Sequence, residues 1–178
     1  ATGDFRNFQQ TAKFVASNLI ANGDLASGIE LFLLIGRSLE ACKILIGHDK
    51  WEEALLIAKT TLPEAECHDV LRKYANYLIS LGLHMRAIGI FISMRAWTDV
   101  FQTLVDNLPA SIPPGSGVPL PSHTKQGWTT AAYRYLHIAV WFARCCEQAK
   151  VQLDEQLVRP VYEKYAKWQR SIGNPMVA

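Results

Sequence analysis

The sequence has no excess of either charge and no long hydrophobic run. Its 178 residues include 18 lysines and arginines against 16 aspartates and glutamates, and the basic residues are scattered along the chain. Nucleic-acid-binding domains usually concentrate basic residues in a stripe, so we expect no nucleic-acid partner. The longest nearly apolar runs, at 28–36 and 88–94, are too short to span a bilayer. We therefore also expect no direct membrane insertion.

The sequence lacks the cysteine and histidine patterns of metal sites and disulfide frameworks. Its four cysteines show no CxxC spacing and no Cys/His ligand spacing. We expect reduced, mostly buried thiols in a cytosolic protein. None of the five histidines is predicted to pair at i, i+4 with a carboxylate or another histidine in a metal-binding pattern. The cysteines are Cys42, Cys67, Cys145 and Cys146.

Catalytic signatures are missing as well. The Cys-His-Asp run at 67–69 suggests chemistry, but consecutive helical residues diverge by about 100° and cannot converge on one ligand. The carboxylate pairs at 52–53 and 154–155 fall at predicted helix starts, where negative charge is favourable, so we interpret them as capping groups. No glycine-rich phosphate loop occurs. We predict no catalytic, cofactor-binding or metal-binding residue, no cofactor and no enzyme activity.

The residues that are present favour an all-α fold. Hydrophobic residues make up 49% of the chain and charged residues 19%, which supports a sizeable core. Apolar residues recur at helical spacing over most of the sequence. The predicted helices cover residues 8–21, 25–35, 39–46, 51–59, 64–81, 84–94, 96–108, 128–150 and 157–172.

Residues at the predicted helix ends support these boundaries. Gly23 and Gly82 can adopt the left-handed conformation that ends a helix at little steric cost. Asp24, Ser38 and Asp49 each precede an apolar-periodic stretch, and we predict that they are N-caps. Successive helices separated by such short turns form antiparallel hairpins.

A weak internal repeat supports stacked hairpins. A turn residue is followed five positions later by a small or β-branched residue and eight positions later by an aliphatic residue. The copies are spaced irregularly, by 26 and then 33 residues, which differs from a regular 34-residue tetratricopeptide array. We therefore predict an irregular α-solenoid of TPR-like antiparallel helical hairpins. The three copies are Gly23, Gly28 and Leu31; Asp49, Ala54 and Ile57; and Gly82, Ala87 and Ile90.

Composition divides the chain into segments. Five of the eight prolines lie between residues 109 and 121, in a stretch that cannot be regular helix and is either a disordered insertion or a binding segment. In the last helix, Pro160 either introduces a kink or marks the true first turn. Because the chain begins with alanine, we expect a piece of a longer protein. The predicted segments are a frayed N-terminus at 1–7, a helical hairpin stack at 8–107, an insertion loop at 108–124, a C-terminal helical hairpin at 125–173 and a truncated tail at 174–178.

Two tryptophans open predicted helices and allow two interpretations. Trp51 and Trp97 could be exposed aromatic anchors for a partner. They could instead be wedges between neighbouring hairpins. We favour the wedge, because large aromatic side chains dominate the cores of small helical modules.

Several stretches together resemble a known family. They include SNLIANGDLASGIEL at 17–31, WEEALLIAK at 51–59, the run from Pro63 to Arg72 with its Cys-His-Asp-Val-Leu-Arg ending, and QLVRPVYEKYAKWQRSIG at 156–173. These resemble the C-terminal helical region of the WD repeat-containing protein 11 family. A looser likeness links 51–59 to helical arrays of other WD-repeat and intraflagellar-transport proteins.

The resemblance implies a non-enzymatic scaffold without catalytic residues. Members of that family carry paired β-propellers followed by an α-solenoid, act in tethering vesicles at the trans-Golgi network and are linked to ciliogenesis. It implies protein partners: the chain's own WD-repeat propellers, tethering-complex subunits and self-association. The implied location is cytoplasmic, peripheral to the Golgi and vesicles, and at the cilium base. The alternatives are a helical subunit of an intraflagellar-transport or ciliary assembly, and an RNA-binding helical module.

Overall fold

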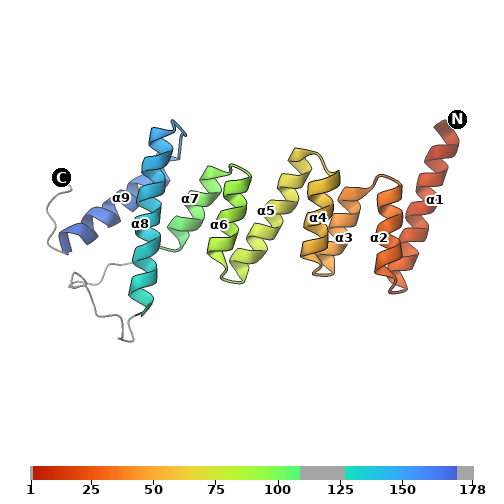
Figure 1. Ribbon diagram of the computed structural model, residues 1–178, viewed down its shortest axis with the longest axis horizontal. Helices are drawn as coiled ribbons and strands as arrows, with labels where there is room; N and C mark the ends of the chain where they lie inside the picture. The colour runs from red at the N-terminus through yellow and green to blue at the C-terminus, as the bar shows by residue number, and fades with distance from the viewer. Residues whose placement is uncertain (1, 109–126, 172–178) are drawn as a thin grey trace. The chain divides into compact units, whose positions relative to one another are not determined.

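The computed structural model describes residues 2–108 and 127–171, and every regular element in these ranges is an α-helix (Figure 1). The predicted truncated tail and the predicted insertion loop beyond Leu108 lie outside the described residues. The helices are α1 (Thr2–Ala21), α2 (Leu25–Leu34), α3 (Ser38–Gly47), α4 (Trp51–Thr61), α5 (Glu64–Ser80), α6 (His84–Ser93), α7 (Trp97–Asp106), α8 (Gly127–Gln148) and α9 (Glu155–Ser171).

The contacts between helices group the chain into two compact units, Ala1–Gly82 and Leu83–Ala178. This differs from the division predicted from composition, which placed one hairpin stack at 8–107 and a separate hairpin at 125–173. The physical reason is that α7 packs against α8 and α9 as well as against α6. The proline-rich stretch therefore separates two parts of one packed unit.

The first unit is built from hairpins. Helices α1 and α2 run antiparallel and pack against each other, as do α3 and α4, while α2 contacts α3 and α4 contacts α5 (Figure 1). Each of these helices turns an apolar face inward, which is how amphipathic helices gain most of their stability in a protein. The largest fully buried side chains here are Phe32, Leu45 and Cys42.

The second unit combines one hairpin with two longer helices. Helices α6 and α7 form the hairpin, α8 packs on α7, and α9 contacts both α8 and α7. Its core includes Val100, Phe101 and Leu104 of α7, Leu136 of α8 and Val161 of α9, all at most 1% exposed. Helix α7 thus contacts each of the other three helices of this unit.

The same backbone turn recurs at most helix ends. Gly23 has a φ of 90°, its N–H donates to the Ile20 carbonyl at 3.0 Å, and the Asp24 N–H donates to the Leu19 carbonyl at 2.9 Å. These are the two hydrogen bonds of a Schellman motif. The paired bonds also occur around Gly36, Asp49, Arg95 and Lys150, and Gly82 shares the positive φ.

These left-handed residues follow a 13-residue spacing. Gly23, Gly36 and Asp49 are each 13 residues apart, and so are Gly82 and Arg95. Gly36, followed by Ala41 and Ile44, therefore adds a further copy of the sequence repeat, whereas Arg95 matches it only in part, because Thr103 stands eight positions after it. After each of these five turns the fifth residue is buried. These buried residues are Gly28, Ala41, Ala54, Ala87 and Val100.

Small residues at these positions bring helices into close contact. A Cβ atom on Gly28 would collide with the Ile20 side chain and lie 3.0 Å from the Ala16 carbonyl oxygen of α1. In the next hairpin, the Cys42 thiol donates to the Ala54 carbonyl at 3.4 Å. Both contacts join residues 12 positions apart across one hairpin. The repeat therefore marks the close-contact point of each hairpin in the first unit.

Two of the three predicted N-caps are wrong. Asp24 does cap α2, since its carboxylate accepts a hydrogen bond from the Ser27 N–H at 3.1 Å. Ser38 is instead the first residue of α3, after Arg37, whose side chain makes no capping bond. Asp49 takes the left-handed conformation, with a φ of 58°, so it ends α3 and does not begin α4. Because Asp49 belongs to the left-handed turn that follows α3, it cannot also be the N-cap of α4, a position that Lys50 occupies.

Three other details differ from the sequence prediction. Helix α1 begins at Thr2, whereas residues 1–7 were predicted to fray, because no proline there stops the helix from extending back from Phe8. The apolar periodicity of the predicted helix at 64–81 places Leu81 on its buried face, but this side chain is 55% exposed. Helix α9 begins five residues before Pro160, so that proline lies inside the helix and does not mark its first turn.

Candidate interaction surfaces

The four cysteines are free thiols. Cys42 is fully buried, and burial, followed by the neighbouring Cys67, raises the pKa of its thiol. Burial likewise raises the pKa of the Cys146 thiol, and Cys145 adds to the shift. A raised pKa keeps both thiols neutral and unreactive at pH 7. In the described ranges, no three His, Cys, Asp or Glu residues are grouped as metal ligands.

One histidine does pair with a carboxylate, contrary to the sequence prediction. His68 Nε2 lies 3.9 Å from Glu64 Oε1, one helical turn earlier on α5. The glutamate side chain is 89% exposed, and two groups at this distance make a surface contact of little energetic weight. The Cys-His-Asp run at 67–69 remains on different sides of α5, with Cys67 half-buried and Asp69 exposed.

Both tryptophans pack inside their own unit, which supports the wedge interpretation. The Trp51 ring stacks on Tyr77 of α5, with centroids 4.8 Å apart, and lies 5.6 Å from the Tyr74 ring. Trp97 lies 6.1 Å from Phe142 of α8. Each tryptophan thus joins the first turn of one helix to a later helix. Neither ring is presented as an isolated exposed anchor.

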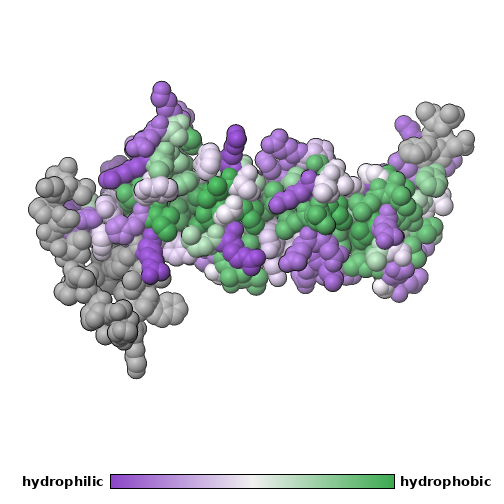
Figure 2. Space-filling model, in the orientation of Figure 1, coloured by the Kyte–Doolittle hydropathy of each residue, from purple (hydrophilic) through white to green (hydrophobic). Residues whose placement is uncertain are grey.

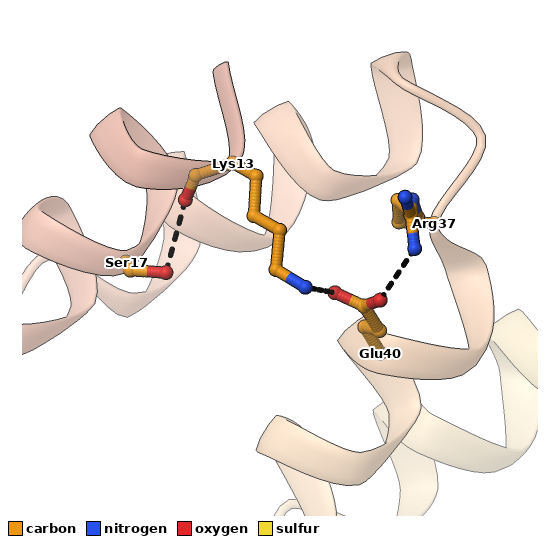
Figure 3. Close-up of polar contacts among 4 residues, drawn as sticks. All are labelled: Lys13, Ser17, Arg37 and Glu40. Atoms are coloured by element: carbon orange, nitrogen blue, oxygen red, sulfur yellow. Dashed lines mark hydrogen bonds and ion pairs between the residues drawn. The ribbon is translucent and has the colours of Figure 1, made fainter. Parts of the chain in front are cut away.

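A polar network joins α1 to the start of α3 (Figure 3). Glu40 accepts from Lys13 Nζ at 2.9 Å and from Arg37 Nη1 at 2.8 Å. The hydrogen bond from Lys13, together with the charges of Lys13 and Arg37, holds the pKa of the Glu40 carboxyl below its ordinary value of 4.5. Nearby, Gln9 Nε2 donates to the Ile35 carbonyl at 3.3 Å. The network is a structural clasp, because its only carboxylate already has two cationic partners.

Apolar side chains reach the surface of the first unit. Leu34 of α2 is 82% exposed, and Phe14 of α1 and Leu56 of α4 are 68% and 66% exposed. On the face shown in Figure 2, apolar surface in green lies over α1 to α4 and is broken by charged side chains in purple. Exposed apolar side chains of this kind are common on proteins that bind other proteins.

A small cavity lies at the closed end of the α8–α9 hairpin. Its volume is about 180 Å³. The last two turns of α8, the connection at 149–154 and the first turn of α9 form its walls. The lining residues are Ala143, Cys146, Glu147, Val151, Leu153, Glu155 and Val158.

Two hydrogen bonds hold this end of the hairpin. The Asp154 carboxylate caps α9 by accepting from the Gln156 N–H at 2.9 Å. Tyr162 Oη donates to Glu147 Oε1 at 3.4 Å. Burial raises the pKa of the Tyr162 hydroxyl, with the Glu147 charge as the next contribution. Sequence reasoning identified Asp154 as a cap but did not predict the cavity.

Comparison with known sequences places the chain in a family. Residues 8–111 match the family described as the WDR11 TPR domain. The chain belongs to the WDR11 TPR domain family. The match covers more than half of the chain and includes all of the first unit except the start of α1. The predicted fold class, an all-α irregular α-solenoid of TPR-like hairpins, is confirmed, and such domains generally mediate protein–protein interaction.

Relatives from vertebrates match over nearly the whole chain. WD repeat-containing protein 11 of Mus musculus is 29% identical over 171 residues, and that of Danio rerio is 30% identical over 169 residues; each match covers 93% of this chain. The chain spans only 12% of the length of these relatives. The matched region therefore corresponds to a helical module of a WD-repeat protein. Among the described helices, none combines the length and apolar character needed to cross a bilayer.

Proposed function

We propose that this chain is a non-enzymatic scaffold module of a WD-repeat protein that acts in vesicle tethering at the trans-Golgi network and in ciliogenesis. It holds protein partners, among them the WD-repeat propellers of its parent protein, subunits of a tethering complex and further copies of itself. It works in the cytoplasm, at the periphery of the Golgi and its vesicles and at the cilium base.

The observation that carries this proposal is the family match over residues 8–111, together with the relatives that match 93% of the chain. The relatives are named for WD repeats, and a helical module in such a protein serves assembly. The structure adds a physical argument. The buried thiols are neutral, and the most connected polar cluster, around Glu40, is fully used in joining helices.

Affinity capture from ciliated cells tests the proposal. The tagged chain and a tagged full-length parent would be compared, with co-purifying proteins identified by mass spectrometry. We expect vesicle-tethering and adaptor proteins in both samples. Depletion of the parent should also shift vesicle cargo away from the trans-Golgi network, and the parent should restore it.

Three results would contradict the proposal. Recovery of ribonucleoproteins that disappear after nuclease treatment would favour an RNA-binding module, and vesicle tethering would then be the wrong assignment. Recovery of intraflagellar-transport subunits, without any Golgi protein, would favour a ciliary assembly subunit. A parent protein that lacks residues 8–171 yet restores trafficking fully would show that this module is not the scaffold.

A further inference from the structure

The cavity at the closed end of the α8–α9 hairpin has the size of a single side chain. Its volume of about 180 Å³ is close to that of an engineered cavity of roughly 150 Å³ that binds benzene. Pockets for cofactors and drug-sized molecules are larger, about 300–1,000 Å³. The cavity therefore fits one leucine-sized or phenylalanine-sized group and excludes a whole cofactor.

The lining of the cavity selects an apolar group. Five of its seven residues are apolar, and only Glu147 and Glu155 carry polar side chains. The Cys146 thiol belongs to the apolar lining, since burial keeps it neutral. A neutral, buried thiol is a poor nucleophile, so the cavity is suited to holding a side chain rather than to covalent chemistry.

The charge at the cavity edge favours particular residues on either side of the apolar side chain that enters the cavity. Glu147 and Glu155 are both exposed, and neither forms an ion pair with another described residue. Of the basic residues close to these carboxylates in sequence, Arg144 interacts with the Tyr162 hydroxyl, Arg159 pairs with Glu163, and Lys150 lies in the turn after α8. Two carboxylates beside an apolar cavity are complementary to a binding partner in which a basic residue lies next to an apolar side chain.

From this size, lining and charge, we infer that the cavity binds a protein segment in which an apolar side chain is flanked by lysine or arginine. The apolar side chain enters the cavity between α8 and α9, and the basic neighbours lie against Glu147 and Glu155. The inference rests on the proposed scaffold function and names the partner chemistry of one surface. The charges contribute mainly specificity and association rate, while the buried side chain contributes most of the affinity.

Fluorescence anisotropy with synthetic peptides and the full chain tests this. The peptides have twelve residues, with leucine, phenylalanine or alanine at the centre, two lysines or two glutamates beside it, and randomised ends. We expect the leucine and phenylalanine peptides with lysines to bind at least about tenfold more tightly than the alanine or glutamate peptides. Equal binding of lysine and glutamate peptides, or no binding by any peptide, would overturn the inference.

Three variants locate the binding. Val158→Phe fills the cavity from a half-exposed position and should abolish binding. Glu155 lies on the surface, and Glu155→Lys should abolish the preference for lysine peptides over glutamate peptides, because one acidic and one basic side chain then lie at the cavity edge. Glu52→Gln, in the first turn of α4 in the other unit, is the matched control and should bind like the unmodified chain. If Val158→Phe lowers the thermal midpoint, the loss of charge preference in Glu155→Lys alone decides the outcome.

Further measurements separate this inference from the proposed function. Sedimentation of the chain at increasing concentration detects self-association. A dimer that Val158→Phe abolishes would identify a second copy as the occupant and overturn the peptide assignment. If the tagged chain captures tethering proteins but Val158→Phe and Glu155→Lys capture them equally well, the cavity assignment fails while the scaffold function stands. If the chain captures none, the scaffold function fails independently of peptide binding.

Discussion

Gly28 is the residue at which the contact between α1 and α2 is least tolerant of change. Its Cα lies against α1, where a methyl group would meet Ile20 and approach the Ala16 carbonyl oxygen. The carbonyl cannot move without shifting the helix that carries it. The absence of a side chain is thus a packing requirement here, whereas at Gly36 it is a requirement of the backbone conformation.

The substitution Gly28→Ala should lower the free energy of unfolding by about 1–3 kcal/mol, because overpacking forces neighbouring groups to shift. The urea midpoint by circular dichroism measures this. Gly89→Ala is the control, because a Cβ there meets nothing within 4 Å in α6. That variant should gain about 0.5–1 kcal/mol from lower chain entropy in the unfolded state. Equal effects of the two variants would show that α1 does not constrain residue 28.

Glu40 should make stability depend on pH in the acid range. Its folded-state pKa is lowered from 4.5, so its contribution is fully present above that value and is lost as the pH falls through the lowered folded pKa. Glu40→Gln should cost about 0.2–1 kcal/mol at pH 7, and the difference should vanish in strong acid. Urea titrations from pH 7 to pH 2 measure it.

Glu53→Gln is the matched control for Glu40. Glu53 lies 3.9 Å from Lys50, and both side chains are more than half exposed. Solvent screens such a pair, so this variant should lose less stability than Glu40→Gln, namely only the small contribution of a carboxylate in the first turn of α4. A loss at Glu53 equal to that at Glu40 would mean that overall charge, and not the clasp between α1 and α3, governs the effect.

The helices of this protein end in a shared way. Each residue with a positive φ lies just beyond a helix, and paired backbone hydrogen bonds satisfy the last carbonyls at five of these ends. Glycine occupies three of these positions, while aspartate, arginine and lysine occupy the others. A left-handed conformation costs a residue with a Cβ roughly 1–2 kcal/mol. The helix ends at Asp49, Arg95 and Lys150 therefore carry backbone strain, which the short connections between helices impose.

Arg95→Gly should relieve part of that strain. Arg95 has a φ of 55° and is exposed, so its replacement removes little packing. We expect a gain of about 0.5–1 kcal/mol after the greater unfolded-state entropy of glycine is subtracted. The reciprocal change, Gly36→Ala, should cost about 1 kcal/mol, since its φ is 73° and no atom crowds the added methyl group. Thermal midpoints measure both. A loss of stability in Arg95→Gly would show that the arginine side chain is needed.

At the scale of the whole molecule, stability should be distributed between two units. The contacts cluster within Ala1–Gly82 and within Leu83–Ala178. In stacked helical arrays, a local defect is felt mainly by the nearest neighbours. The response to a destabilising substitution should therefore be confined largely to the unit that contains it.

Hydrogen exchange on the full chain checks this. Gly28→Ala should speed amide exchange in α1 to α4 by more than in α7 and α8, because opening of one unit does not require opening of the other. A matched substitution in the second unit, Phe101→Leu, should produce the opposite pattern, since Phe101 is fully buried there. Equal acceleration across all helices in both variants would mean that the chain unfolds as one cooperative unit.

Sequence by itself determined the helical class and most of the elements. Helical spacing of apolar residues predicts all nine helices of the described ranges, and Gly23 and Gly82 predict two of the helix ends, because glycine alone adopts a positive φ without cost. The repeat of a small residue five positions after a turn indicated the close contact at Gly28. These features depend on interactions between residues near one another in sequence.

Tertiary structure decided everything that depends on distant residues. Only the packed helices show that Lys13 reaches Glu40 and that α7 packs against α8 across the proline-rich stretch. The lining of the cavity at the closed end of the α8–α9 hairpin lies within residues 143–158, but the space between the two helices depends on how they pack. The spacing of apolar residues identifies the apolar face of a helix but not the helix that covers it. Many pairings of helices would bury a similar area of apolar surface and would therefore be similarly stable.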